Sequence, residues 1–193
     1  MRSIFTKKEK LKKQKRNTLI VSIILIVVIC LSIFGIVANS FGNSENSNEV
    51  DYNGYKFYSS GDFWVLEEGD FKFVFLNNPK DLENMTFEAN PLKFLPSYSQ
   101  KVLYLSSEDS VSSYQIYSNL EPFLTRIQYA CLDEKNCTDN LPIKNCTENF
   151  VVIRKSETNK ILQQDKCVFI EGKEQDLYKL TEIFLLKILG VRE

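Results

Sequence analysis

Residues 150–190 have the sequence FVVIRKSETNKILQQDKCVFIEGKEQDLYKLTEIFLLKILG, and their patterns indicate the fold class more clearly than any other segment. Short runs of β-branched residues alternate with polar turns, and a longer segment then repeats apolar residues at helical spacing. Leu177, Leu180, Phe184 and Ile188 form the inner stripe of that helix. We expect strands at 150–155 and 167–171, a turn at 156–159, a return strand at 160–164, and a helix at 174–189 ending before Gly190.

The segment before position 80 has an aromatic strand pattern. Asn53-Gly54 lies between two apolar runs, and this dipeptide is the strongest short signal for a β-hairpin. Phe71, Phe73 and Phe75 alternate with other residues and so share one face of a strand. We interpret that face as core rather than as a binding platform. The pattern predicts a β-meander with strands at 50–52, 55–58, 63–66 and 71–76.

The middle of the chain predicts a strand, a helix and a second strand. Residues 101–105 form the first strand, and residues 107–109 cap a helix in which Val111, Tyr114, Tyr117 and Leu120 recur at helical spacing. Pro122 ends or kinks this helix, and residues 125–132 favour a strand. The fold class is therefore α+β or mixed α/β: a β-meander followed by a mixed sheet with two packed helices.

A long apolar segment lies near the N-terminus. Residues 17–38 carry no charge, and residues 18–38 (TLIVSIILIVVICLSIFGIVA) would span roughly 31 Å as a helix, close to the roughly 30 Å of a bilayer core. Residues 1–16 hold eight basic side chains and one acid, which predicts a cytoplasmic tail followed by a transmembrane helix. The alternative is a cleaved signal peptide, whose apolar region is usually shorter.

The charge of the rest of the chain limits its partners. From position 41 onward the sequence has 16 basic and 24 acidic residues, a net charge near -8. Such a domain repels phosphate backbones, so we expect no nucleic-acid partner. Residues 39–49 (NSFGNSENSNE) are polar and predict a flexible linker. Residues 50–193 would then form an extracytoplasmic domain at the cell membrane, with the lipid bilayer as a partner of the anchor.

Four cysteines lie beyond the apolar segment: Cys131, Cys137, Cys146 and Cys167. An even number in an extracytoplasmic domain favours two disulfides, for which three pairings are possible. A hairpin that turns between Ser156 and Asn159 would bring Cys146 close to Cys167, which leaves Cys131 for Cys137. The alternative is a four-thiolate zinc site, but the chain has no C-x-x-C pair.

Three sequons for N-glycosylation begin at Asn84, Asn136 and Asn145. All three lie in the predicted extracytoplasmic domain, and two of them overlap the cysteine region. Chance matches are common in a chain rich in asparagine. The sequons predict candidate glycosylation sites on an exposed surface.

The sequence offers little catalytic chemistry. It has no histidine, which removes Ser-His-Asp and Cys-His catalysis, and it has no nucleotide-binding, EF-hand or G-x-S-x-G motif. We predict no cofactor, no metal site and no catalytic residue. Glu67, Glu68 and Asp70, together with Glu108 and Asp109, are acids at predicted turns and caps, where structural roles are common. Trp64, on the opposite parity to Phe63 and Val65, is the candidate for surface recognition.

Scattered parts of the chain resemble small, uncharacterised single-pass membrane proteins of archaea. The resemblance rests on the opening Asn53-Gly54-Tyr55-Lys56-Phe57, on residues 167–172 (CVFIEG), on Asp176-Leu177 and on residues 185–191 (LLKILGV). It implies an N-terminal anchor, a small cysteine-containing ectodomain and an archaeal cell surface. It implies no activity.

Three functional hypotheses follow. The first is a membrane-anchored binding module that recognises a protein or an envelope glycan without catalysis. The second is an envelope hydrolase that depends on carboxylates such as Glu67, Glu68 and Asp70. The third is an accessory subunit of a larger membrane complex. The sequence does not indicate an oligomeric state.

Overall fold

The computed structural model describes residues 49–132, 137 and 140–192. The predicted cytoplasmic tail at 1–16, the predicted transmembrane helix at 17–38 and residues 39–48 of the predicted linker lie outside the described residues. Within the described part, no helix is both long enough and apolar enough to cross a bilayer. Glu49, which the sequence places in the linker, is the first residue of strand β1.

The described domain contains strands, two α-helices and several short 3₁₀ turns. In chain order they are β1 (Glu49–Tyr52), β2 (Tyr55–Ser60), β3 (Phe63–Glu68), β4 (Phe71–Phe75), η1 (Pro79–Leu82), β5 (Glu88–Ala89), η2 (Leu95–Ser97), β6 (Val102–Ser107), α2 (Ser110–Leu120), η3 (Glu121–Phe123), β7 (Arg126–Tyr129), β8 (Phe150–Lys155), β9 (Lys160–Gln164), β10 (Cys167–Gly172), η4 (Glu174–Asp176) and α3 (Leu177–Ile188).

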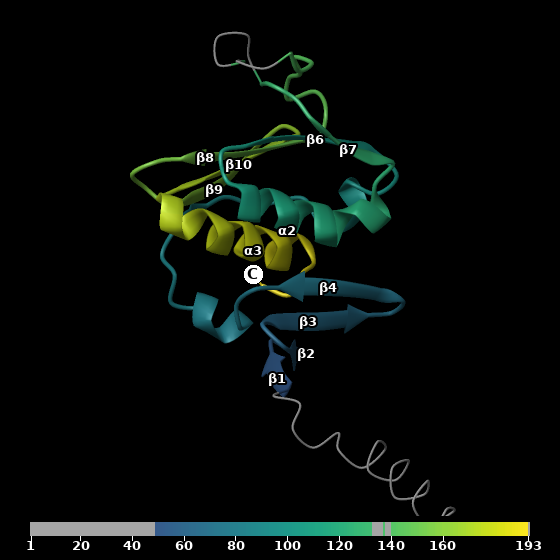
Figure 1. Ribbon diagram of the computed structural model, residues 1–193, viewed down its shortest axis with the longest axis vertical. Coiled ribbons are helices and arrows are strands. Elements are labelled where there is room, and N and C mark those ends of the chain that lie inside the picture. The colour runs from purple at the N-terminus through teal and green to yellow at the C-terminus, as the bar shows by residue number, and fades with distance from the viewer. Residues whose placement is uncertain (1–48, 133–136, 138–139, 193) are drawn as a thin grey trace, which may run out of the picture. The chain divides into compact units, whose positions relative to one another are not determined.

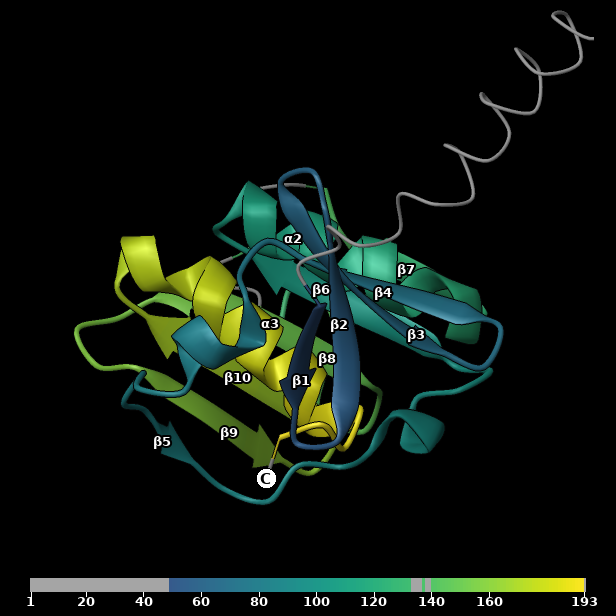
Figure 2. The same ribbon diagram turned by 90° about the horizontal axis from the view of Figure 1, so that it is seen from below.

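These elements form three layers. The antiparallel sheet β1-β2-β3-β4 lies on one side of the two helices, and the mixed sheet β5-β9-β10-β8-β6-β7 lies on the other (Figure 1). Seen from below, the first sheet crosses in front of the helices (Figure 2). The predicted α+β class, with a four-stranded antiparallel sheet, a mixed sheet and two helices, is confirmed. The sequence did not predict that the meander would cover the far side of the helices.

The predicted meander is present in the predicted order. Its first turn has Asn53 at φ 54° and Gly54 at φ 83°, the left-handed values that a two-residue hairpin turn requires. Phe57, Phe73 and Phe75 are buried on the face that meets the helices, and the rings of Phe57 and Phe75 lie 5.7 Å apart. The prediction that the period-2 aromatics of residues 71–75 form core is therefore confirmed for Phe73 and Phe75 but not for Phe71, which is 43% exposed beside the hairpin turn.

The mixed sheet differs from the prediction in one pairing. The sequence suggested that strand 160–164 returns along strand 150–155. In the structure β9 pairs antiparallel with β10, and β8 pairs parallel with the other side of β10. The strand β10 therefore separates the two strands that were expected to form a hairpin. A local turn pattern does not reveal this arrangement, because the third strand arrives later in the chain.

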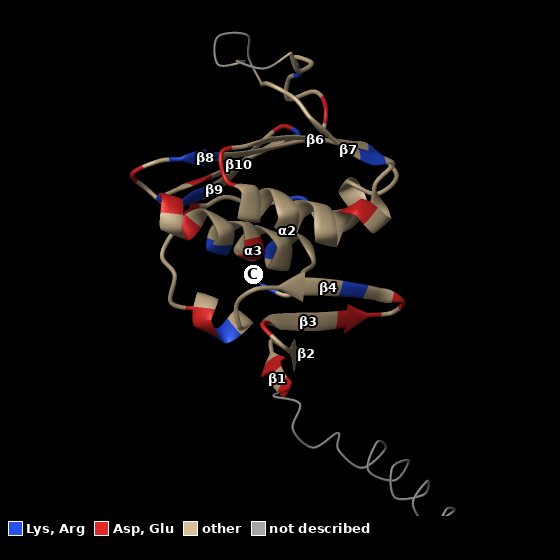
Figure 3. Ribbon diagram, viewed as in Figure 1, with Lys and Arg blue, Asp and Glu red and all other residues tan. Residues whose placement is uncertain are grey.

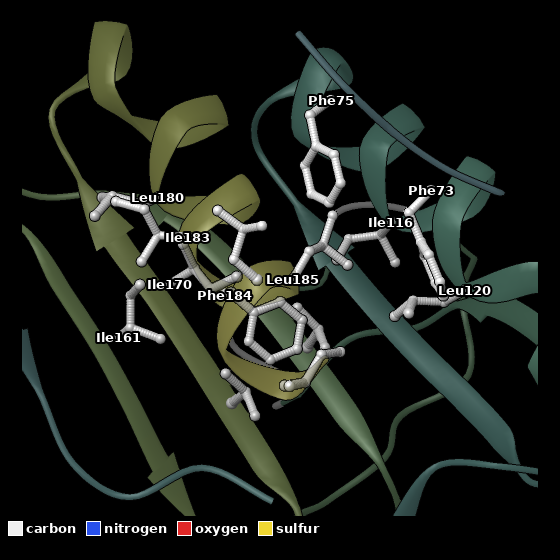
Figure 4. Close-up of a cluster of buried hydrophobic side chains, with 14 of the residues drawn as sticks. Phe73, Phe75, Ile116, Leu120, Ile161, Ile170, Leu180, Ile183, Phe184 and Leu185 are labelled. Carbon is white, nitrogen blue, oxygen red and sulfur yellow. The ribbon is translucent and has the colours of Figure 1, made fainter. Parts of the chain in front are cut away.

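The helix α3 is buried on almost every side because it lies between the two sheets. Leu177, Leu180, Phe184 and Ile188, its predicted inner stripe, are all buried. Ile183 and Leu185 are buried as well (Figure 4). So are Thr181, Glu182 and Leu186. The predicted start at residue 174 corresponds to the short turn η4, which leads into α3.

The helix α2 has the predicted position but buries a different face. Asp109 caps its N-terminus by accepting a hydrogen bond of 2.7 Å from the amide of Ser112, as acids at this position commonly do. Of the stripe that predicted the helix, only Leu120 is fully buried, whereas Val111 and Tyr114 are exposed. The buried face instead carries polar side chains, Gln115 and Asn119, beside Ile116.

Asn119 explains why that face is polar. Its side-chain Oδ1 accepts a hydrogen bond of 2.7 Å from the amide of Val74, and its Nδ2 donates one of 2.9 Å to the carbonyl of Val74. The side chain thus takes the place of a neighbouring strand along the open edge of β4. Buried backbone groups require such partners, so Asn119 protects this edge and fixes the meander to α2.

Glu182 on α3 continues the protection of the same edge. Its carboxylate accepts hydrogen bonds from the amide of Leu76, from Nδ2 of Asn77 at 2.6 Å and from Nε2 of Gln115 at 3.1 Å. The side chain is fully buried, and this burial raises the pKa of the Glu182 carboxyl above its ordinary value, although the hydrogen bonds from Asn77 and Leu76 oppose the shift. Together, Glu182 and Asn119 join the meander to both helices.

Candidate functional site

The four cysteines beyond position 130 form the two predicted pairs. Cys131 is bonded to Cys137, and Cys146 is bonded to Cys167. Cys146 meets Cys167 for a reason other than the hairpin expected between residues 150–155 and 160–164, because those two strands do not pair with each other. The segment before β8 runs beside the start of β10, where the amide of Lys166 donates to the carbonyl of Cys146 at 3.2 Å. Cys167 is fully buried, and its disulfide fixes Cys146 to the sheet face that faces away from the helices.

The predicted glycosylation sites are partly described. Asn84 and Asn145 are exposed, and Asn136 lies outside the described residues. The hydroxyl of Thr147 donates to Oδ1 of Asn145 at 2.7 Å, so the third sequon forms a local turn on the surface. Both described asparagines are therefore open to solvent.

Trp64 does not lie on an exposed surface. It is half-buried and packs against the main core on the same side of the meander as Leu66 and Phe75. Side chains alternate between the two faces of a strand, so Trp64 points to the face opposite that of Phe63 and Val65, and this is the inner face. The more exposed aromatic on β3 is Phe63.

Three of the five acids considered for catalysis have structural partners, and Asp70, like Glu68, is exposed. Glu67 forms an ion pair of 2.7 Å with Lys72 across the hairpin, and Glu68 is exposed next to the turn. Asp109 is the N-cap of α2, and Glu108 accepts a hydrogen bond of 2.9 Å from the amide of Lys155. The geometry of these acids favours turns and caps rather than a paired acid and base.

The turn from β10 into η4 leads a strand into a helix N-terminus, a place where anions can bind. Its acids are held by cations: Glu171 pairs with Arg154, and Glu174 pairs with Lys155 at 2.8 Å. An open, shallow hollow lies elsewhere, beside the second disulfide, and is lined by Lys93, Cys146, Thr147, Asp165 and Lys166. In the described ranges, no group of three histidine, cysteine, aspartate or glutamate side chains is arranged to hold a metal ion.

The surface that departs most from an ordinary solvated face lies on α2 and β7. We call it the tyrosine patch: Val111, Tyr114 and Tyr117 of α2 together with Tyr129 of β7. Tyr114 is 63% exposed, and Val111 and Tyr129 are each 41% exposed. The rings of Tyr117 and Tyr129 lie 6.0 Å apart, which joins the helix face to the strand.

The hydroxyl group of Tyr117 is held by the backbone of β7. The hydroxyl of Tyr117 donates to the carbonyl of Ile127 at 3.3 Å. Burial, and to a smaller extent the neighbouring Tyr129, raises the pKa of Tyr117. Tyr117 is thereby held over β7, while Tyr114 extends into solvent.

The helix that carries most of the patch has no charged residue. Residues 110–120 are SVSSYQIYSNL, and α2 has neither blue nor red segments in Figure 3. Exposed helix faces normally carry charged side chains, which keep them solvated. Tyrosine and serine together provide rigid contact area and adaptable hydrogen bonds, a composition typical of binding surfaces.

The structure offers a more exposed aromatic residue than Trp64, which the sequence pattern singled out for surface recognition. Tyr114 was counted as a helix-forming position and Trp64 as the surface candidate, whereas Tyr114 is 63% exposed and Trp64, like Tyr117, is half-buried against the core. The signal that was available is the absence of charge from residues 110–120. An uncharged helix whose apolar stripe is made of tyrosines indicates a surface that contacts something other than water.

Comparison with known proteins does not assign the chain to a family. No family model matches it, and no curated protein or solved structure is significantly similar to it. The functional argument therefore rests on the tyrosine patch and on the disulfides.

Proposed function

We propose that the protein is a membrane-anchored, non-catalytic binding module whose extracytoplasmic domain recognises a partner protein through the tyrosine patch. The observation that carries the proposal is the exposed, uncharged face of α2, on which Tyr114 is 63% exposed and Tyr117 lies against Tyr129 of β7. Aromatic side chains contribute much of the binding energy of protein interfaces, and tyrosine does so with little loss of conformational entropy.

Several features support the cellular placement in this proposal. The two disulfides are compatible with an oxidising compartment, where such bonds persist. The uncharged segment at 17–38 and the basic residues before it would anchor the chain with its N-terminus in the cytoplasm. The resemblance to archaeal single-pass proteins implies a cell surface, and on such a surface the exposed Asn84 and Asn145 would carry glycans.

Site-directed photo-crosslinking tests the proposal. We expect the full chain carrying p-benzoylphenylalanine in place of Tyr114 to form an adduct with a second protein when intact membranes of the source organism are irradiated. The matched control carries the same group in place of Phe94, which is 61% exposed but lies beside Gly190, outside the patch. Adducts of equal yield from both positions, or none from position 114, would contradict the proposal.

A further inference from the structure

The two sheets of the described domain have four edges, and the chain protects three of them. The edge of β4 is covered by Asn119 and Glu182. The edge strand β5 has only two residues, Glu88–Ala89, and β1 carries the acids Glu49 and Asp51. Short strands, charged side chains and covering helices are the usual ways in which proteins prevent unwanted strand pairing. The fourth edge, that of β7, lacks a comparable protection along Ile127 and Tyr129.

The edge of β7 is open to pairing at Ile127 and Tyr129, whereas the next outward-facing residue, Cys131, already pairs with residues 142–144 of the same chain. This strand has four residues, RIQY, without proline or lysine, and its one charge is on its first residue, Arg126. The amide of Ala130 donates to the carbonyl of Leu105 at 3.0 Å. Because backbone groups alternate in direction along a parallel strand, the amides of Ile127 and Tyr129 face away from β6. The Ile127 carbonyl lies on that side too, since it accepts from Tyr117.

We infer that β7 accepts an added strand: an extended segment of a partner protein pairs with the backbone of Ile127 and Tyr129 and places alternate side chains on the tyrosine patch. Strand addition obtains affinity from main-chain hydrogen bonds and specificity from contacts with every second side chain. The exposed rings of Tyr114 and Tyr129 provide those contacts. This inference rests on the proposed function and specifies the kind of partner.

Charge indicates the composition of the added segment. Arg126 is exposed, and no carboxylate in the described ranges forms an ion pair with it. A partner segment with an acidic residue at that position would complete the pair, and apolar or aromatic residues would alternate with it. A second copy of β7 supplies no carboxylate, so self-pairing would leave the guanidinium of Arg126 without a partner. The charge thus favours a foreign segment over a second copy of this chain.

Peptide selection tests the inference. The full chain is reconstituted in lipid nanodiscs and used to select displayed random peptides, with empty nanodiscs as the background. We expect enriched peptides in which an acidic residue accompanies alternating apolar residues. On binding such a peptide, the amides of Ile127 and Tyr129 should exchange hydrogen more slowly, because they become bonded to the added strand.

Two variants at one position separate backbone pairing from ring contact. Tyr129→Val removes the ring and keeps the backbone N–H, whereas Tyr129→Pro removes both the ring and the N–H. Because this N–H faces away from β6, the proline removes no hydrogen bond between β7 and β6. We expect Tyr129→Pro to bind the selected peptide at least about tenfold more weakly than Tyr129→Val does.

Three results would overturn the inference. Equal affinity of Tyr129→Val and Tyr129→Pro would show that the patch binds without strand addition, and the proposed function would remain. A doubled particle mass with pairing at β7 would identify the occupant as a second copy. Enrichment of no peptide above the background would contradict the inference, whereas the proposed function is tested by the crosslinking yield at position 114.

Discussion

Glu182→Ala is expected to destabilise the domain by about 3 kcal/mol, among the largest effects of any single substitution in this chain. The carboxylate accepts hydrogen bonds from Leu76, Asn77 and Gln115 inside the protein, where water does not replace it. Its removal leaves these donors buried without an acceptor, and each such group costs about 1–3 kcal/mol. The measurement is a urea titration of the full chain, followed by the fluorescence of Trp64, the one tryptophan in the sequence.

Two further variants make the result specific. Glu182→Gln keeps the shape and one acceptor oxygen, so we expect a smaller loss, about 1–2 kcal/mol. Glu121→Gln changes an exposed carboxylate at the end of α2 and should alter stability by less than about 0.5 kcal/mol. If Glu182→Ala unfolds at the same urea concentration as the native chain, the account of the β4 edge is wrong.

The same carboxyl gives stability a pH dependence whose direction is fixed. Burial raises the folded-state pKa of Glu182 above the ordinary value of 4.5, so the folded state binds its proton more tightly than the unfolded state does. The contribution of this proton to the free energy of unfolding is therefore fully present below pH 4.5, the ordinary pKa, and is lost as pH rises through the raised pKa of the folded state. Glu182→Gln has no such proton, and its stability relative to the native chain should improve over that interval.

Replacement of the second disulfide is expected to give the other large effect. The variant Cys146→Ala/Cys167→Ala should lose about 3 kcal/mol, because the bridge closes a loop with a sequence separation of 21 and lies beside the buried β10. The variant Cys131→Ala/Cys137→Ala opens a loop with a separation of 6 and should lose about 2 kcal/mol. Urea midpoints of the two unreduced variants provide the comparison.

A thiol titration checks that the bridges exist in the protein from its own membrane. The denatured, unreduced chain should show one reactive thiol, that of Cys30, out of five cysteines. Five reactive thiols would show that the chain holds no disulfide. This result would contradict both the stability expected from loop closure and the placement of the domain in an oxidising compartment.

Local sequence patterns were sufficient where an element is buried by its own apolar residues. The meander was predicted because Phe73 and Phe75 alternate on one face, and α3 because its leucines recur at helical spacing. The same rule failed for α2, whose buried face carries Gln115 and Asn119. Asn119 is buried because the distant Val74 requires a hydrogen-bond partner, and no local pattern contains that requirement.

Long-range pairing was the other limit of the sequence argument. The turn at 156–159 suggested a hairpin, yet β10 lies between β8 and β9. The pair Cys146–Cys167 was nevertheless the expected one, because the hairpin and the observed parallel pairing both bring the start of β10 near residue 146. The tyrosine patch could not be located until the buried face of α2 was known.

The placement of the domain outside the cytoplasm is the claim on which the binding proposal depends, and the accessibility of the C-terminus tests it most directly. An epitope is added after Glu193 of the full chain, and intact cells are probed with an antibody that does not cross membranes. The account predicts that the epitope is bound without permeabilisation. Binding only after the membrane has been opened would place the disulfide-bonded domain in the cytoplasm and contradict the account.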